Sequence, residues 1–261
     1  MQIDSPNNAT LQEWKKLQTA KGRKAQQRFI VEGEHLVREA VKYGEVESVL
    51  LRDTLDPTEY GIDDSMRVAV LSERAFKEIS SVESQQGIAA VVKIPETTLD
   101  LYNAPRLLAL DGVQDPGNVG TLIRTADAAG FSAVLIGQGC ADPYAPKTVR
   151  STQGSIFHLP VVPCSLLDVL YPWLAANSGT EKNSAAIVGT DAAAAVQYDE
   201  WFAPKNVCLI MGNEGAGISG AVRQLCTEFL SIPIHGFAES LSVSIAGGIL
   251  MYSIQSAKAQ Q

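Results

Sequence analysis

The sequence lacks the long apolar stretches that mark membrane-spanning and secreted proteins. Its longest apolar run, Val243 to Ile254, is well short of the roughly 18 residues that a membrane-spanning helix needs. The first residues, MQIDSPNNATLQEWKK, contain no apolar core of a secretory signal. We therefore expect a soluble, cytoplasmic protein that does not insert into a membrane.

Cysteine and histidine are also scarce, and those present are scattered. The 4 cysteines form no Cys-x-x-Cys pair, and the 3 histidines stand alone, with no His-Glu-x-x-His motif. Zinc sites need such ligands at close, regular spacing, so no metal is expected, and the cysteines are expected to be reduced core residues. The positions are Cys140, Cys164, Cys208, Cys226, His35, His158 and His235.

An excess of positive charge is missing as well. The formal net charge is −8, which argues against bulk electrostatic attraction to nucleic acid. Residues 1–30 are the exception, because six basic side chains against two acidic ones give this stretch +4. The pattern leaves two interpretations open, a solvated helix face or a surface that binds RNA.

What is present predicts two α/β domains joined by a linker. Residues 1–95 read as a small unit with a polar helix around Leu11–Arg28 and the strands Ser48–Leu51 and Val68–Leu71. The stretch PETTLDLYNAPR, with two prolines and little apolar content, places a linker at 96–106. Residues 107–261 then form the second, larger domain.

The second domain repeats the order strand, glycine-containing loop, helix. Leu107–Leu110, Ala133–Ile136 and Val207–Met211 are short apolar strands, and Thr121–Ala129 is a helix closed by Gly130. Alternation of helices with continuously apolar strands is typical of a parallel sheet covered on both faces. The fold class is therefore α/β.

Three loops of this domain leave apolar strands, where ligands of α/β sheets bind. They are Asp111–Gly120, Gly212–Gly217 and Ile232–Ser244. None is a GxGxxG or a Walker A loop, so a nucleotide-dependent oxidoreductase is the weaker reading. Asn118 belongs to the first loop, and Arg124 lies six residues on, inside the following helix; residues six apart do not share a helix face. Their side chains converge only if Asn118 lies in the loop.

The order of the motifs resembles the SpoU (TrmH-like) family of RNA 2′-O-ribose methyltransferases. The motifs read DGVQDPGNVGTLIRTADAAG, LIMGNEGAGIS and IPIHGFAESLSVSIAGG. A connecting segment, KTVRSTQGSIFHLP, lies between the first two, and FIVEG and QGI upstream match larger family members. The resemblance covers nearly the whole chain.

The resemblance implies a SPOUT methyltransferase domain with a deep trefoil knot, an exception to the rule that chains are unknotted. It further implies a homodimer that binds S-adenosyl-L-methionine (SAM) through the knotted loops. The first domain resembles the L30e-like RNA-binding module of members that modify 23S rRNA. This favours 23S rRNA as the substrate, with tRNA as an alternative. A catalytically weak RNA-binding ribosome-assembly factor of the same fold is the rival from another class.

Site residues are carried over from the family by position. The catalytic candidates are Asn118, Arg124, Glu214 and Ser242. The cofactor-binding candidates are Gly189, Gly212, Gly217, Ile232 and Leu241. From the basic stretch, the RNA-binding candidates are Lys15, Lys16, Arg23 and Lys24.

The chemistry constrains two of these roles. The family's proposed base is the arginine at position 124, yet a free guanidinium stays protonated. A clamp on the phosphate beside the target ribose is the other interpretation, and the sequence does not decide between them. Ser242 stands where the family usually has asparagine, and a hydroxyl is shorter than an amide. We expect an active enzyme in which Ser242 helps to order the pocket.

Overall fold

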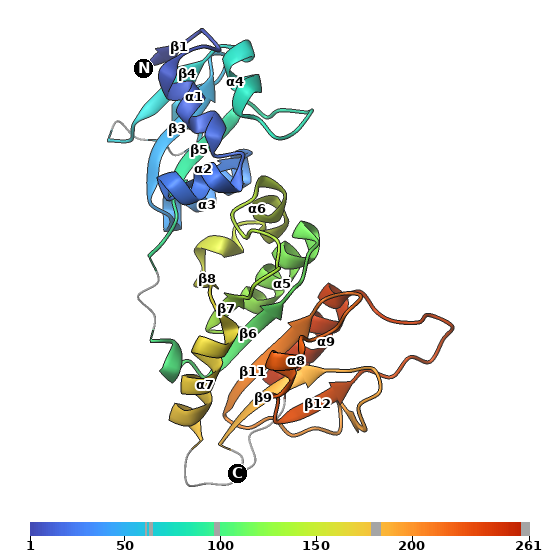
Figure 1. Ribbon diagram of the computed structural model, residues 1–261. Coiled ribbons are helices and arrows are strands. Elements are labelled where there is room, and N and C mark those ends of the chain that lie inside the picture. Colours follow the sequence, from blue (N-terminus) through green and yellow to red (C-terminus); the bar gives the residue numbers. More distant parts are fainter. Residues whose placement is uncertain (61, 63–64, 97–99, 179–183, 257–261) are drawn as a thin grey trace. The chain divides into compact units, whose positions relative to one another are not determined.

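The computed structural model describes residues 1–60, 62, 65–96, 100–178 and 184–256. The chain forms two compact units (Figure 1). Unit 1 comprises residues 1–96 together with 144–158, and unit 2 comprises 97–143 together with 159–261. Residues 144–158, which contain most of the connecting segment at 147–160 and belong to the predicted second domain, thus pack with the first 96 residues. In the described part of the chain, no helix has the length and apolar character needed to cross a bilayer.

Unit 1 is a five-stranded mixed sheet with short helices around it. The strand order is β1-β4-β3-β5-β2, and β5 runs antiparallel to both neighbours. The strands are β1 (Gln2–Ile3), β2 (Arg28–Glu32), β3 (Val46–Arg52), β4 (Val68–Leu71) and β5 (Ile88–Lys93). The helices are α1 (Ala9–Lys16), α2 (Ala20–Gln26), α3 (Glu34–Tyr43), α4 (Glu73–Ile79) and α6 (Pro146–Thr152), with 3-10 turns at Pro57–Tyr60 and Ser155–Phe157. The mixed α/β fold predicted for this part of the chain is confirmed.

The predicted helix over Leu11–Arg28 is wrong, because the chain forms two helices there. The hydroxyl of Thr19 accepts a hydrogen bond from the Gly22 amide at 3.1 Å and begins α2. A Cβ on Gly22 would lie 2.0 Å from the Lys16 carbonyl oxygen, so only glycine permits this close turn. After α2, Gln27 adopts a left-handed conformation and the chain enters β2 at Arg28.

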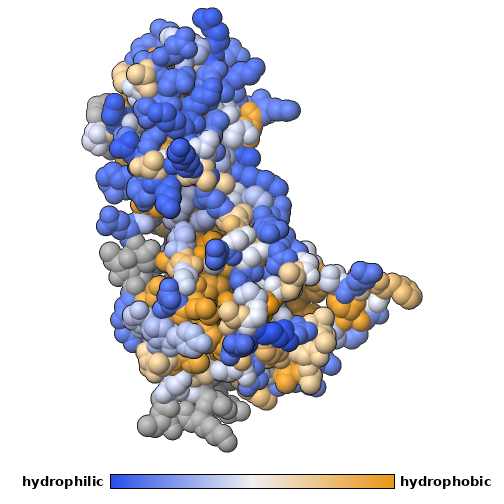
Figure 2. All heavy atoms as spheres, viewed as in Figure 1, coloured by the Kyte–Doolittle hydropathy of each residue, from blue (hydrophilic) through white to orange (hydrophobic). Residues whose placement is uncertain are grey.

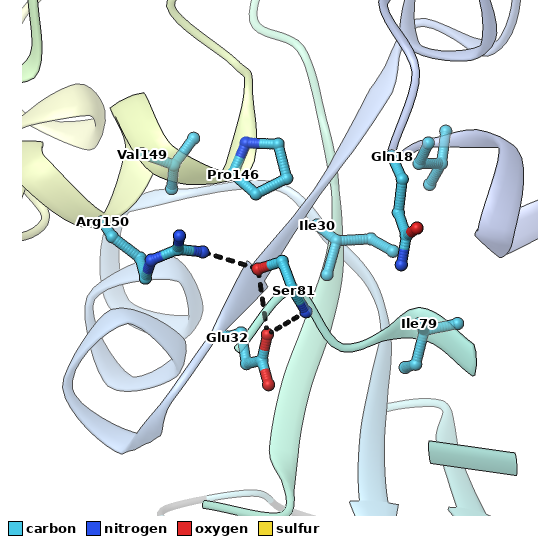
Figure 3. Close-up of a pocket in the computed structure, with 9 residues that line it drawn as sticks. Gln18, Ile30, Glu32, Ile79, Ser81, Pro146, Val149 and Arg150 are labelled. Atoms are coloured by element: carbon cyan, nitrogen blue, oxygen red, sulfur yellow. Dashed lines mark hydrogen bonds between the residues drawn. The ribbon is translucent and has the colours of Figure 1, made fainter. Parts of the chain in front are cut away.

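Helix α6 is held in unit 1 by a polar contact (Figure 3). The Arg150 guanidinium donates to the Ser81 hydroxyl at 2.5 Å, and the Ser81 amide donates to the Glu32 carboxylate at 2.9 Å. The cavity beside them measures about 10 Å³. That volume is at the limit for a single water molecule, so it is a packing gap and not a ligand site.

Unit 2 contains a seven-stranded sheet in which every pairing is parallel, as the apolar strands predict. The strand order is β10-β12-β9-β11-β6-β7-β8. The strands are β6 (Arg106–Asp111), β7 (Ala133–Ile136), β8 (Val161–Pro163), β9 (Ala185–Thr190), β10 (Val196–Gln197), β11 (Asn206–Gly212) and β12 (Glu228–Ser231). The helices are α5 (Pro116–Ala128), α7 (Leu166–Asn177), α8 (Gly220–Arg223) and α9 (Val243–Ser256), with a 3-10 turn at Leu101–Asn103. All carboxyl ends of the strands therefore lie at one edge.

Helix α5 begins five residues earlier than the expected Thr121. The Asp115 carboxylate accepts a hydrogen bond from the Asn118 amide at 2.9 Å and caps the helix. Pro116 follows in the first turn, where its missing N–H costs nothing. Asn118 consequently lies inside the first turn of α5 and not in the preceding loop.

Candidate active site

A hydrogen-bonded network joins the three predicted motifs, and Asn118 is at its centre. The Asn118 side-chain amide donates to the Glu214 carboxylate at 3.1 Å. The hydroxyl of Ser244 donates to the Asn118 carbonyl oxygen at 2.9 Å. Asn118 comes from α5, Glu214 from the loop after β11, and Ser244 from the first turn of α9. The structure thus brings two predicted catalytic residues together with a serine that is not among the predicted site residues.

Ser242 touches this network only at its margin. Its hydroxyl lies 3.4 Å from the Ser244 hydroxyl, and it accepts a hydrogen bond from the Ile245 amide at 3.4 Å. Its carbonyl oxygen accepts the first helical bond, from the Ala246 amide at 3.0 Å. Ser242 is therefore the N-cap of α9, and an asparagine, the usual family residue, would serve equally well as a cap.

Arg124 lies apart from the network. Asn118 and Arg124 both belong to α5, six residues or about one and two-thirds turns apart, so their side chains leave different faces. Arg124 is exposed and, within the described residues, forms no hydrogen bond or ion pair. The condition under which the two side chains converge, a loop position for Asn118, is not met.

Two further residues fix the loops that carry the network. The Asn213 side chain accepts hydrogen bonds from the amides of Gly215 and Ala216 at 2.9 and 2.8 Å. It also donates to the Gly112 carbonyl at 2.8 Å, which ties the second motif to the first. The buried Asp111 carboxylate accepts a hydrogen bond from the Ser219 amide at 2.7 Å and likewise links the first motif to the second. An asparagine directly after a strand is a signal for such a turn, but its partner 101 residues away cannot be read from the sequence.

The glycines among the cofactor candidates meet different surroundings. A Cβ on Gly212 would lie 2.5 Å from the Gly217 carbonyl carbon, and one on Gly189 would lie 2.5 Å from the Phe229 ring. These two glycines are therefore required by packing within the chain itself. Gly217 differs, since it has a φ of +71° and open space where a Cβ would be.

The remaining cofactor candidates flank an extended loop between β12 and α9. Figure 1 shows this loop reaching away from the sheet before the chain enters α9. Ile232 is half-buried and Leu241 is exposed, as is Phe237 between them. Among the described residues, the main chain of 234–241 takes part in no backbone–backbone hydrogen bond. The predicted cofactor loop thus follows the carboxyl end of β12 and presents unpaired backbone groups together with exposed apolar side chains.

The RNA-binding candidates differ in their exposure and in the partners that they already have within the chain. The ammonium groups of Lys15 and Lys16 pair with Glu78 and Glu13, each at 2.5 Å. Lys24 is exposed. Arg23 is only 4% exposed, and its guanidinium donates to the Leu17 carbonyl at 2.7 Å, at the end of α1. Arg23 supports the fold and is not placed to contact RNA.

The cysteines of unit 2 are held in their protonated form. Burial raises the pKa of the Cys164 and Cys226 thiols to about 11, and it also raises that of Cys140. A thiol with a raised pKa is a weak nucleophile near neutral pH. Within the described residues, no group of three or more histidine, cysteine, aspartate or glutamate side chains could hold a metal ion.

Comparison with known proteins places both halves of the chain. Residues 105–252 match the SpoU rRNA Methylase family, and residues 8–90 match an MRM3-like substrate binding domain. The chain is 41% identical over 256 residues to the Bacillus subtilis 23S rRNA (guanosine(2553)-2′-O)-methyltransferase RlmP, covering 97% of this chain and 99% of that protein. It is 30% identical to the 23S rRNA (uridine(2479)-2′-O)-methyltransferase of Streptomyces viridochromogenes, covering 94% and 88%.

Solved structures agree with this placement. The SpoU methyltransferase AviRb from Streptomyces viridochromogenes in complex with AdoMet superposes with a TM-score of 0.85 at 28% identity, covering 95% of this chain and 97% of that one. The AdoMet-bound rRNA methyltransferase from Sinorhizobium meliloti gives 0.83 at 27% identity, covering 98% and 97%. The family model spans more than half of the chain, and the relatives match it almost end to end. The chain belongs to the SpoU rRNA methylase family.

Proposed function

We propose that this protein transfers a methyl group from SAM to the 2′-hydroxyl of one ribose in 23S rRNA. The observation that carries the proposal is the network of Glu214, Asn118 and Ser244, which joins the three family motifs at the carboxyl edge of the sheet. Two relatives that match nearly the full chain are named as 23S rRNA 2′-O-methyltransferases. A ribosomal RNA substrate also favours a cytoplasmic location.

The network suits the demands of this reaction. SAM, when bound, supplies an activated methyl group. The protein has to orient the ribose hydroxyl in line with it and assist removal of the hydroxyl proton. Glu214 uses one carboxylate oxygen for Asn118, which leaves acceptor capacity for a hydroxyl donor. We assign Glu214 and Asn118 to orienting the reacting groups.

Arg124 fits the clamp role better than the base role. A guanidinium gives up its proton only in surroundings that strongly disfavour its charge, and the Arg124 side chain is exposed. An exposed guanidinium without a partner among the described residues is suited to a bidentate contact with an RNA phosphate. We therefore propose that Arg124 holds the phosphate beside the target ribose.

We also propose that unit 1 contributes to RNA binding. Lys15, Lys16 and Lys24 are exposed, and the ion pairs of the first two lie at the surface, where such pairs contribute little and exchange partners readily. A phosphate backbone can therefore replace Glu78 and Glu13 as the counter-charge. The match of residues 8–90 to a substrate binding domain supports the same assignment.

We further propose that the protein acts as a homodimer through the outer face of α9. Ile245 and Tyr252 are 56% and 51% exposed and lie seven residues apart in α9, so they share one face of the helix and form an apolar stripe. Leu241, 36% exposed, lies in the loop just before the helix begins. On the face shown in Figure 2, apolar residues are frequent over unit 2, whereas unit 1 is mainly hydrophilic. The small residues of α9 serve another purpose, since Gly247 admits the Leu122 side chain of α5. The trefoil knot that the family implies remains a prediction.

The decisive test is transfer of labelled methyl groups to RNA. Full-length protein and labelled SAM are incubated with unmodified 23S rRNA or with unmodified tRNA, and the modified ribose is mapped. Label at a single 2′-oxygen of 23S rRNA is the expected result. Label in tRNA alone would move the substrate to tRNA. Tight RNA binding without transfer to either would favour the ribosome-assembly factor.

A further inference from the structure

A shallow, open cavity lies at the carboxyl ends of β7 and β8, on the edge of the unit 2 sheet that also carries the network. Its volume is about 320 Å³. Ile136, Pro163 and Cys164 come from the strand ends, and Gln138, Cys140 and Pro143 come from the loop after β7. None of the predicted site residues lines it. At the low end of the range for ligand pockets, it is large enough for one small planar group.

The cavity adjoins the loop that leads to the network. The Ala141 amide donates to the Val113 carbonyl at 2.9 Å, and the Cys140 thiol donates to the Leu110 carbonyl at 3.2 Å. A Cβ on Gly139 would lie 3.7 Å from the Gly112 Cα, an ordinary van der Waals contact, so the two loops are neighbours there. The wall of the cavity is therefore fixed to the first motif by main-chain contacts.

The strand order sets the cavity opposite the cofactor loops. Along the sheet, β12 and β9 come first, β11 and β6 lie in the middle, and β7 and β8 follow. Gly189 in β9 and the loop after β12 carry cofactor candidates. Gly212 and Gly217 lie with the network at the segments after β11 and β6, and the cavity follows β7 and β8. A substrate that reaches the network on the side away from the cofactor lies beside this cavity.

We propose that this cavity receives a nucleobase of the RNA, unstacked from the strand beside the reacting ribose. The inference rests on the proposed function, and it adds a base-binding subsite to it. Proteins that recognise RNA by sequence splay out single-stranded bases and read their edges. The two prolines and Cys164 offer an apolar surface to the flat faces of a base. The exposed Gln138 amide carries both a donor and an acceptor for its edge.

The lining favours a base over a phosphate group. None of the residues around the cavity is lysine, arginine or histidine, and Asp142 adds a carboxylate. A phosphate would therefore meet a like charge and no cation. An uncharged aromatic ring with hydrogen-bonding edges meets neither difficulty.

Thiol alkylation in the intact protein tests occupancy without turnover. Cys164 lines the cavity and Cys226 does not, yet both thiols are half-buried with a pKa raised to about 11, so Cys226 is a matched internal reference. The protein is labelled with iodoacetamide at pH 9, without nucleotide or with GMP, UMP or CMP at millimolar concentration. Mass spectrometry then measures the rate of labelling at each cysteine. We expect at least threefold slower labelling of Cys164 with one or more nucleotides and no change at Cys226.

Two compounds identify what occupies the cavity. Ribose 5-phosphate has the sugar and phosphate without a base, and S-adenosylhomocysteine has the adenosine of the cofactor. Neither is expected to protect Cys164. Equal protection by ribose 5-phosphate, protection by S-adenosylhomocysteine alone, or no protection by any nucleotide would each overturn the proposal. The result does not depend on methyl transfer, so it is separate from a failure of the proposed function.

Substitution of Gln138 tests whether the base-binding subsite contributes to methylation. Gln138→Ala removes the hydrogen bonds to the base edge, and Gln224→Ala, at another exposed glutamine of unit 2, is the matched control. Without these hydrogen bonds, kcat/KM for RNA is expected to fall about tenfold, mainly through KM. SAM affinity and the control variant should stay within twofold of the parent. Equal activity of the two variants would contradict the assignment.

Discussion

The amide of Asn118 has its two ends fixed by partners of opposite character. Its NH₂ group faces the Glu214 carboxylate, and its carbonyl faces the Ser244 hydroxyl. Reversal of the amide would set two acceptors against each other at Glu214. Ser244, which is buried, therefore acts as a positioning residue for the group that holds Glu214.

Removal of the Ser244 hydroxyl should loosen this arrangement. We expect Ser244→Ala to lower kcat about tenfold because the Asn118 amide and Glu214 lose their fixed orientation. KM for RNA and SAM affinity should change little, and Ser244→Thr, which keeps a hydroxyl, should recover part of the loss. Ser253→Ala removes a hydroxyl from the same helix, bonded to the Tyr198 carbonyl, and is the control. Equal kcat for the two alanine variants in single-turnover assays would remove Ser244 from the site.

Ser242 has a different role, as the cap of α9. Ser242→Asn should preserve stability and activity because asparagine caps a helix as well as serine does, whereas Ser242→Ala should cost about 1 kcal/mol in urea unfolding. A parent protein without turnover that is rescued by Ser242→Asn would identify the chain as the RNA-binding alternative.

Arg124→Ala should leave stability unchanged and lower single-turnover methylation on the order of 100-fold if Arg124 clamps the ribose phosphate.

At the scale of elements, the two glycines that bound the second motif loop should respond differently to substitution. Gly212→Ala drives a Cβ into the main chain of Gly217 and Ile218, so the loop has to open. Gly217→Ala meets open space, and only its positive φ is unfavourable, at a cost of about 1 kcal/mol. We expect Gly212→Ala to lose SAM binding and at least twice as much unfolding free energy as Gly217→Ala. Calorimetry measures SAM binding, and urea unfolding measures the free energy of unfolding. Equal losses in the two variants would show that the loop accommodates a Cβ at Gly212.

The sequence predicts the strands of both units better than it predicts where the helices begin. Ala133–Ile136 and Val68–Leu71 have the predicted bounds, because short apolar runs between polar loops leave little choice. The helix start at Pro116 was missed because the glycine-rich segment before Thr121 reads as loop. The network was predicted only in part. Asn118 and Glu214 were carried over from the family by position. Ser244 and Asn213 lie in the same motifs, but their roles come from partners 126 and 101 residues away, which no local pattern reveals.

At the scale of the whole molecule, the charge distribution predicts how RNA binding depends on salt. Replacing Lys15, Lys16 and Lys24 by glutamine should weaken binding to 23S rRNA and reduce the salt slope of log K by about one for each phosphate that a lysine no longer neutralises. Arg23 stays in place because its guanidinium supports the end of α1. SAM affinity should not change. If affinity and slope match those of the parent across a salt titration, this face is only solvated.

The apolar stripe on α9 bears on the assembly of the whole protein. A monomer would leave Ile245 and Tyr252 in water, and a second copy of α9 offers a matching surface that a twofold axis can bring together. Light scattering at micromolar concentration should therefore report about twice the chain mass of 27.9 kDa. Ile245→Asp puts a charge at the centre of the stripe and should shift the protein towards monomer. Tyr171→Asp, at an exposed aromatic residue of α7, is the control and should leave the dimer intact. A parent protein that scatters as a monomer would refute the dimer, and equal dissociation of both variants would place the interface elsewhere than on α9.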